Sequence, residues 1–223
     1  MASLHSHTLV KKGQRVAATR AIPLVMKRAS VERAAAIART NGWVVDVLPL
    51  QSARVGLVIT GNEVYQGLIQ DRFAPILRAK VEALGSEVAA MDQVPDSAER
   101  IAATIHKQME QGCDLLLLTG GMSVDPDDVT RHGIRRAGAD PIHYGAAALP
   151  GAMLLVAYIG DVPLLGVPGC ALHHPTTVLD LVLPRFLAGE TIGRRELAFL
   201  GHGGLCQDCD RCTFPHCGFG KAL

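Results

Sequence analysis

From residue 54 onward, apolar runs bounded by glycine alternate with amphipathic stretches. This order is typical of a parallel β-sheet whose strands are joined by crossover helices. The predicted elements are buried strands at 54–61, 87–94 and 113–121, a hairpin at 153–169, and helices at 73–85, 129–138 and 171–189. We therefore expect an α/β fold, a three-layer sandwich around a mostly parallel sheet, with a short Cys-rich tail at the C-terminal end.

One further helix, between the second and third predicted strands, has a clear start signal. Asp96 is followed three residues later by Glu99, which is the spacing of a capping box. Ile101, Ile105 and Met109 then recur every four residues and would face the sheet. The pattern predicts that Asp96 is the N-cap of this helix.

The first fifty residues have a less regular pattern. A helical period at 29–42 ends at a glycine, and 43–50 has the apolar composition of a strand. Such a region would form a small lobe or an extra layer on the main sheet. The predicted organisation is an N-terminal region at 1–53, a main domain at 54–192 and a cysteine-rich tail at 193–223.

The charge balance narrows the classes of partner. The chain of 223 residues has 22 Lys and Arg against 21 Asp and Glu, a formal net charge of +1. No strong field would gather nucleic acid or an anionic membrane, so a small molecule or a protein is the expected partner. The start of the chain lacks a signal-peptide pattern, and the longest apolar stretch, 146–160, is too short to span a bilayer. We expect a cytoplasmic protein with reduced thiols.

Two loops have the composition of an anion-binding site. Thr60, Gly61, Asn62 and Glu63 follow the first strand, and the sequence TGGMS at 119–123 follows the central one. In open α/β sheets, ligands bind beyond the carboxyl ends of the strands, where glycines let backbone amides approach an anion. Neither loop has the spacing of a Walker loop or a dinucleotide fingerprint. A tight turn that closes a strand is the structural alternative.

Taken together, these loops resemble the molybdopterin-binding domain shared by the enzymes that complete molybdenum cofactor synthesis. The family's TGDE loop corresponds to TGNE at 60–63, and its S/T-G-G-x-S/G loop corresponds to 119–123. The family's acidic residue before a threonine corresponds to Asp128, and its L-P-G-N-P turn to VPGC at 167–170. The resemblance extends over about 54–189.

The resemblance implies that a molybdopterin phosphate binds across these loops, with carboxylates that hold Mg²⁺ or approach molybdate. The residues it assigns to cofactor binding are Thr60, Gly61, Thr119, Gly120, Gly121, Ser123, Pro168 and Gly169, and the acids it assigns to catalysis are Glu63, Asp96 and Asp128. Amides and hydroxyls suit a phosphate, whereas carboxylate oxygens suit magnesium. Capping for Asp96 and a surface charge for Glu63 are the structural alternatives, and Asp125 and Asp127 are interpreted as solvated turn residues.

Two departures from the family pattern bear on function. The molybdotransferases of this family have a K-P-G-K-P segment before the hairpin, whereas 148–152 contains no lysine, so an anionic ligand would lose two cationic contacts. The family's Asn-Pro after the last glycine is replaced by Cys170 and Ala171. His173 and His174 follow at the predicted start of a helix, where a structural role is favoured over metal binding.

The tail contains four cysteines in the sequence CQDCDRCTFPHC at 206–217. The CxxCxxC run of Cys206, Cys209 and Cys212, with Cys217 as a fourth ligand, is typical of an iron–sulfur cluster. Zinc is the alternative metal, and disulfides or unmetallated thiols remain open. So short a segment is expected to have little core of its own and to depend on the metal for order.

Two functions remain open at this point. In the first, the chain binds molybdopterin or its nucleotide and acts in molybdenum or tungsten cofactor biosynthesis or delivery, either as a Mg²⁺-dependent molybdopterin adenylyltransferase or in the manner of a molybdotransferase. In the second, it is a non-catalytic sensor or binding module whose iron–sulfur or zinc tail contacts a partner. The retained acids favour the first and the missing lysines the second. Expected partners are the pterin and a molybdoenzyme or cofactor-synthesis protein, and a homo-oligomer is compatible with the sequence.

Overall fold

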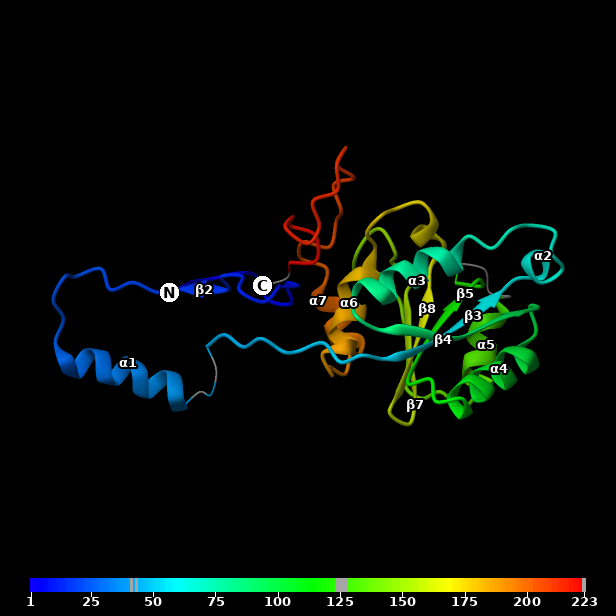
Figure 1. Ribbon diagram of the computed structural model, residues 1–223, viewed down its shortest axis with the longest axis horizontal. Coiled ribbons are helices and arrows are strands. Elements are labelled where there is room, and N and C mark those ends of the chain that lie inside the picture. The colour runs from blue at the N-terminus through cyan, green and yellow to red at the C-terminus, as the bar shows by residue number, and fades with distance from the viewer. Residues whose placement is uncertain (41, 43, 123–127, 222–223) are drawn as a thin grey trace. The chain divides into compact units, whose positions relative to one another are not determined.

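The computed structural model describes residues 1–40, 42, 44–122 and 128–221 (Figure 1). The chain divides into two units, Met1–Pro49 and Leu50–Leu223. Among the described residues, no helix has both the length and the apolar character needed to cross a membrane.

The Met1–Pro49 unit has little regular structure. Its strands β1 (Ala2–Ser3) and β2 (Ala17–Ala18) pair antiparallel, and α1 (Arg28–Thr40) confirms the predicted helix. The strand predicted at 43–50 is wrong for 44–50, which contains no strand, and residue 43 lies outside the described part. An apolar run forms a strand only where a neighbouring strand can pair with its backbone groups. None of the described residues of this unit is buried.

The Leu50–Leu223 unit is built on a six-stranded sheet with the order β4-β3-β5-β8-β7-β6. The strands are β3 (Arg54–Thr60), β4 (Glu87–Val94), β5 (Leu115–Thr119), β6 (Ile142–Tyr144), β7 (Leu155–Ile159) and β8 (Val162–Val167). The first four in this order pair in parallel, and β7 and β6 complete the sheet antiparallel. The predicted mostly parallel sheet and the hairpin are therefore confirmed, while β6 was not predicted.

Helices cover both faces of the sheet, as Figure 1 shows. The helices α3 (Phe73–Ala83), α6 (Val178–Leu187) and α7 (Arg194–Phe199) pack on one face, and α4 (Ala98–Glu110) and α5 (Val129–Arg136) on the other. Successive residues of the fully buried β5 point to opposite cores, with Leu117 in one and Leu118 in the other. This alternation produces the predicted three-layer sandwich. Two short elements, α2 (Asn62–Tyr65) and the 3₁₀ helix η1 (Gly169–Leu172), follow β3 and β8.

The start of α4 differs from the prediction by one residue. Ser97, not Asp96, is the N-cap, and its hydroxyl accepts a hydrogen bond from the Arg100 amide at 3.4 Å. Glu99 accepts a hydrogen bond from the Ser97 hydroxyl at 3.2 Å instead of reaching back to a free amide. Asp96 therefore does not cap α4, and its carboxylate accepts a hydrogen bond from the Asn62 amide instead.

The closing helix is shorter than predicted. In place of one helix over 171–189, η1 ends at Leu172 and α6 begins only at Val178. Pro175 restricts the residue before it, and Thr177 starts α6 with a capping box in which the Asp180 carboxylate accepts from the Thr177 amide at 2.7 Å. The histidines at 173 and 174 therefore lie outside any helix.

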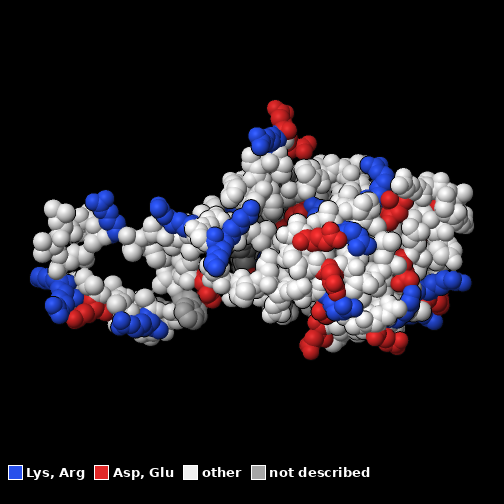
Figure 2. All heavy atoms as spheres, in the orientation of Figure 1, with Lys and Arg blue, Asp and Glu red and all other residues white. Residues whose placement is uncertain are grey.

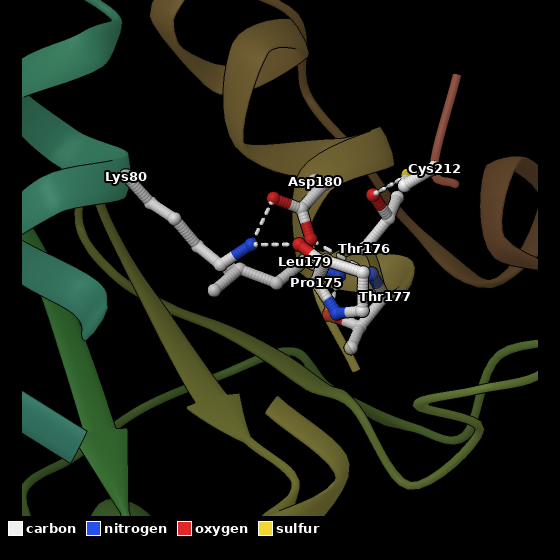
Figure 3. Close-up of polar contacts among 7 residues, drawn as sticks. All are labelled: Lys80, Pro175, Thr176, Thr177, Leu179, Asp180 and Cys212. Atoms are coloured by element: carbon white, nitrogen blue, oxygen red, sulfur yellow. Dashed lines mark hydrogen bonds and ion pairs between the residues drawn. The ribbon is translucent and has the colours of Figure 1, made fainter. Parts of the chain in front are cut away.

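An ion pair joins α3 to the start of α6 (Figure 3). The ammonium of Lys80 lies 2.5 Å from the Asp180 carboxylate and donates to the Pro175 carbonyl at 2.8 Å. Both charged side chains are only 16% exposed, so solvent screens the pair less than a surface pair. The pair fixes the segment between η1 and α6 against the body of the domain.

Candidate functional site

The parallel register places the ends of four strands at one edge of the sheet. Thr60 pairs with Val94, and Thr119 pairs with both Ile59 and Val167. The loops that follow β3, β4, β5 and β8 therefore meet at this edge, where parallel sheets bind ligands.

Two buried threonine hydroxyls and one backbone carbonyl connect the first two of the predicted loops. The Thr60 hydroxyl donates to the Thr119 carbonyl at 2.7 Å and lies 3.0 Å from the Thr130 hydroxyl. Because the single proton of Thr60 is committed to the carbonyl, the proton between the two hydroxyls comes from Thr130. These bonds join the end of β3, the end of β5 and the first turn of α5.

The glycines of the central loop are required by close packing. Gly120 and Gly121 have φ angles of 80° and 56°, a region that side-chain-bearing residues rarely adopt. A Cβ on Gly120 would lie 2.3 Å from the Thr60 hydroxyl oxygen, and one on Gly121 would lie 2.7 Å from that of Thr130. The backbone of this loop can therefore pack against the threonines only where no side chain intervenes.

Thr119 contains a buried polar atom with no partner among the described residues. Its hydroxyl oxygen is fully buried, although its own backbone carbonyl accepts from Thr60. An unsatisfied buried hydroxyl has a free-energy cost of about 1–3 kcal/mol. Such an atom is uncommon, because buried polar groups in folded proteins are almost always hydrogen-bonded.

Asp96 holds the loop after β3. Its carboxylate accepts a hydrogen bond from the Asn62 amide at 3.0 Å, and the Asp96 amide donates to the Asn62 side-chain carbonyl at 3.1 Å. Glu63, the next residue, lies exposed in the first turn of α2. The two hydrogen bonds between Asn62 and Asp96 thus hold Glu63 at the carboxyl ends of the strands. The sequence alone did not predict this pair.

Asp128 lies directly before α5 and near a cation that the sequence analysis missed. The Arg131 guanidinium carbon lies 4.7 Å from the centre of the Tyr144 ring. Burial raises the pKa of Tyr144, the Arg131 charge and hydrogen bond oppose this rise, and the Asp128 charge adds to it. Arg131 therefore lies over the Tyr144 ring in the first turn of α5, three residues after Asp128.

The predicted acids do not by themselves make a metal site. Among the described residues, no three or more His, Cys, Asp or Glu side chains are grouped so that they could hold a metal ion. Mg²⁺ is often bound by only one or two carboxylates together with substrate phosphates, so a sparse set of acids remains compatible with it. Ser123, Asp125 and Asp127 lie outside the described residues.

The turn after β8 completes the edge. Pro168 is buried and its carbonyl accepts from the Ala171 amide at 3.1 Å, which starts η1. Gly169 is exposed, and a Cβ built on it would have no atom within 4 Å. The turn therefore presents open backbone beside the loop of Gly120 and Gly121.

The segment 148–152, where the resemblance leads us to expect lysines, has another role in this chain. Leu149 forms a parallel bridge with Leu205 of the tail. The Leu149 amide donates to the Gly204 carbonyl at 2.7 Å, and the Leu149 carbonyl accepts from the Cys206 amide at 2.9 Å. This segment binds the tail.

The tail has more core than the sequence analysis expected. Phe219 is only 4% exposed, and Phe214, Cys206 and Cys217 pack partly buried against the same core. All four tail cysteines are free, with Cys209 and Cys212 exposed. The metal site predicted at these cysteines stays a prediction, because no group of ligands is assembled in the described part of the chain.

The surface of the Leu50–Leu223 unit shown in Figure 2 has Lys and Arg interspersed with Asp and Glu. No broad region of one sign covers the visible face of this unit, in keeping with the balanced net charge of +1. Recognition of an anion would therefore depend on individual groups at the strand edge.

Comparison with solved structures shows a shared fold. The Thermus thermophilus molybdopterin biosynthesis enzyme MoaB matches 62% of this chain and 98% of its own, with a TM-score of 0.51 and 24% identity. The CinA protein of Thermoplasma acidophilum matches 61% of this chain and 98% of its own, with a TM-score of 0.53 and 16% identity. At these identities the likeness concerns the fold alone.

Sequence relatives cover parts of longer proteins. A molybdopterin molybdenumtransferase of Synechococcus elongatus is 36% identical over 144 residues, which are 60% of this chain and 36% of that protein. A CinA-like protein of Mycobacterium tuberculosis is 40% identical over 79 residues, 35% of this chain and 18% of that protein. This chain thus spans about a third or less of the length of these relatives. The family model described as a probable molybdopterin binding domain matches residues 56–188, more than half of the chain. The chain therefore belongs to the family of probable molybdopterin binding domains.

Proposed function

We propose that this chain binds molybdopterin or its nucleotide at the edge formed by the ends of β3, β5 and β8, and that it acts in molybdenum or tungsten cofactor biosynthesis or delivery. The observation that carries the proposal is the buried, unpartnered Thr119 hydroxyl beside the loop of Gly120 and Gly121. If the loop that covers this fully buried hydroxyl shifts on binding, a phosphate oxygen would give it the acceptor that it lacks.

The phosphate would bind to backbone and hydroxyl groups. Gly169 leaves its backbone open to close approach, whereas Gly120 and Gly121 let the loop after β5 turn tightly against Thr60 and Thr130. Thr119 and Ser123 would add hydroxyl donors. Thr60, Gly61 and Pro168 would shape the site by holding the loops at their ends. Family membership and these contacts support this assignment together.

Arg131 would supply the positive charge. The lysines expected at 148–152 are absent, whereas Arg131 lies in the first turn of α5, directly after Thr130 of the threonine cluster. A guanidinium can form two parallel hydrogen bonds with a phosphate. Tyr144 would hold the guanidinium in place through its ring.

The acids would serve a metal-assisted step. Glu63 and Asp128 would hold Mg²⁺ together with the pterin phosphate, and Asp96 would position the Glu63 loop through Asn62. A divalent ion neutralises charge that develops on phosphate oxygens during adenylyl transfer. In this arrangement Asp96 acts as a positioning residue.

Identification of the co-purified ligand tests the proposal. The full chain is expressed anaerobically in a molybdopterin-producing host, denatured, and its released pterin is oxidised and identified. We expect stoichiometric pterin from the wild type and from Gly138→Ala, and little from Gly121→Ala. Both glycines have positive φ angles, 87° and 56°, but a Cβ on Gly138 would have no atom within 4 Å. Absence of pterin from the wild type would contradict the proposal.

A non-catalytic binding module is the second candidate. The observation that favours it is the use of Leu149 to bind the tail, at the place where the family's lysines are expected. Turnover separates the two candidates. Adenylyl transfer from ATP and Mg²⁺ to molybdopterin, lost in Asp128→Asn without loss of pterin binding, would support the enzyme. Pterin binding without adenylyl transfer or molybdate insertion would support the module.

A further inference from the structure

The cysteine-rich tail forms a closed loop. The Gly220 amide donates a hydrogen bond of 2.9 Å to the Gly203 carbonyl, so the two ends of the loop meet. Cys206 lies three residues after one end, and Cys217 lies three residues before the other. Each of the two outer cysteines therefore lies three residues from the point where the loop closes.

Both ends of this loop are fixed to the body of the domain. Cys206 is held by its amide bond to Leu149, and Phe219 is buried in the core shared with α6. The rings of Phe214 and Phe219 lie 6.5 Å apart in an edge-on arrangement. The entropic cost of bringing the two ends together is therefore offset without any metal.

The middle of the loop is weakly held. Among the described residues, one backbone hydrogen bond lies within 206–217, from the His216 amide to the Thr213 carbonyl at 2.8 Å. Cys209 is exposed, and the Cys212 sulfur lies 3.4 Å from the Thr176 hydroxyl at the start of α6 (Figure 3). These two cysteines can turn toward the loop ends without breaking regular structure.

We infer that Cys206, Cys209, Cys212 and Cys217 hold one thiophilic metal centre, either an iron–sulfur cluster or a zinc ion. Each thiol loses its proton as it binds, so loading releases protons and requires thiolates. Four soft sulfur ligands exclude magnesium and calcium, which take oxygen ligands. The closed loop supplies the preorganisation, and the metal supplies the contacts that the middle of the loop lacks.

The metal centre would lie beside the segment that leads from the pterin-site turn to α6. His174 Nδ1 lies 3.6 Å from an Asp208 carboxylate oxygen, and Thr176 contacts Cys212. Both residues belong to the stretch between η1, which begins at Gly169, and α6. Metal loading should therefore raise the hydrogen-exchange protection of 173–177.

Metal analysis of the full chain tests the inference. Wild-type protein purified anaerobically is analysed for iron, zinc and acid-labile sulfide, together with Cys209→Ser, Cys212→Ser and Cys113→Ala. Cys113 is a buried thiol of the other core and serves as the matched control. Iron with sulfide identifies a cluster and zinc alone a zinc site. Either metal should remain in Cys113→Ala and be lost from both tail variants.

A titration with Co²⁺ keeps the test independent of the host. Chelated, reduced wild type should bind one Co²⁺ with the intense charge-transfer and visible bands of tetrahedral thiolate ligation, and with increased protection at 173–177. Metal-free purified protein that also fails to bind Co²⁺ would overturn the inference. Equal binding by Cys209→Ser and wild type would do so too. None of these outcomes depends on pterin binding.

Discussion

Asn62 and Asp96 exchange two hydrogen bonds across the ends of neighbouring strands. The Asn62 amide donates to the Asp96 carboxylate at 3.0 Å, and the Asp96 amide donates to the Asn62 side-chain carbonyl at 3.1 Å. The pair joins the loop after β3 to the loop after β4, and Glu63 is the next residue of the first loop. The conformation of the acidic loop therefore depends on a residue from another strand.

Asp96→Asn and Asp96→Ala separate positioning from charge. An asparagine oxygen can still accept from the Asn62 amide, so Asp96→Asn should keep pterin affinity within about twofold. Asp96→Ala loses the acceptor and should lose about 1 kcal/mol of stability and most of the affinity. Calorimetric titration measures the pterin affinity, and urea unfolding measures the stability. Equal loss of affinity in the two variants would assign a charge-based role to Asp96 instead.

Arg131→Gln should weaken pterin binding roughly tenfold, a loss of about 1.4 kcal/mol. The reason is the loss of the cation held over Tyr144 near the threonine cluster. Arg135→Gln, an exposed position in the last turn of α5, is the matched control and should bind like the wild type. If the two variants bind pterin equally well, Arg131 is not the phosphate cation.

Gly56→Ala should destabilise the domain by about 1–3 kcal/mol because the site is fully packed. A Cβ at this position would lie 2.2 Å from the Gln108 side-chain oxygen and 2.4 Å from a Leu116 methyl carbon. Gln108 is itself fully buried and bonds to the Leu57 carbonyl at 3.0 Å, so it has little room to move. Urea unfolding measures the change. Gly218→Ala, with no atom within 4 Å of its Cβ position, should have little effect.

Asp92 should make stability depend on acid pH. Burial raises the pKa of its carboxyl, but hydrogen bonds from Lys107 at 2.6 Å and Gln108 at 2.9 Å, with the Lys107 charge, outweigh it and lower the pKa below 3.8. The folded-state pKa is thus below the unfolded one. The stabilisation that the Asp92 carboxylate provides is fully present at pH values above its pKa in the unfolded chain. It is lost as the pH falls through its pKa in the folded protein.

The free energies of unfolding of Asp92→Asn and the wild type, measured from neutral to acid pH, test this dependence. The variant should be less stable at neutral pH, and its stability should fall less between pH 5 and the acid limit. Identical acid dependence of the two proteins would show that Asp92 does not contribute to it.

The strands β3, β5, β7 and β8 could be predicted because each is a largely apolar run. The central strand β5 is buried along its whole length and consists of four leucines and a threonine, so its composition alone predicts a buried strand. The run at 44–50 has similar composition but no partner strand, and a pattern cannot show whether a partner exists. The start of α6 was misplaced because Pro175 and the Thr177 capping box interrupt a sequence whose apolar residues continue through it.

The candidate site was predicted as a set of loops but not as a set of contacts. Thr60, Gly120 and Gly121 lie where parallel strand ends were expected to meet. Arg131 and Tyr144 had no signal of their own, because an arginine on a helix and a tyrosine on a short strand acquire a role only when the fold places them together. Only the structure shows such long-range pairs.

Replacement of Thr119 by valine tests most directly whether molybdopterin binds at the loop that follows β5. The hydroxyl has no partner among the described residues, so an equally shaped methyl group should leave the free energy of unfolding unchanged or raise it. Thr60→Val, which removes the donor to the Thr119 carbonyl, should lower it by about 1 kcal/mol. The decisive measurement is the calorimetric titration of Thr119→Val with molybdopterin. We predict a stable, folded variant whose affinity is at least about tenfold weaker than that of the wild type. Wild-type affinity in Thr119→Val, or no binding by the wild type itself, would contradict the proposal that molybdopterin binds at this loop.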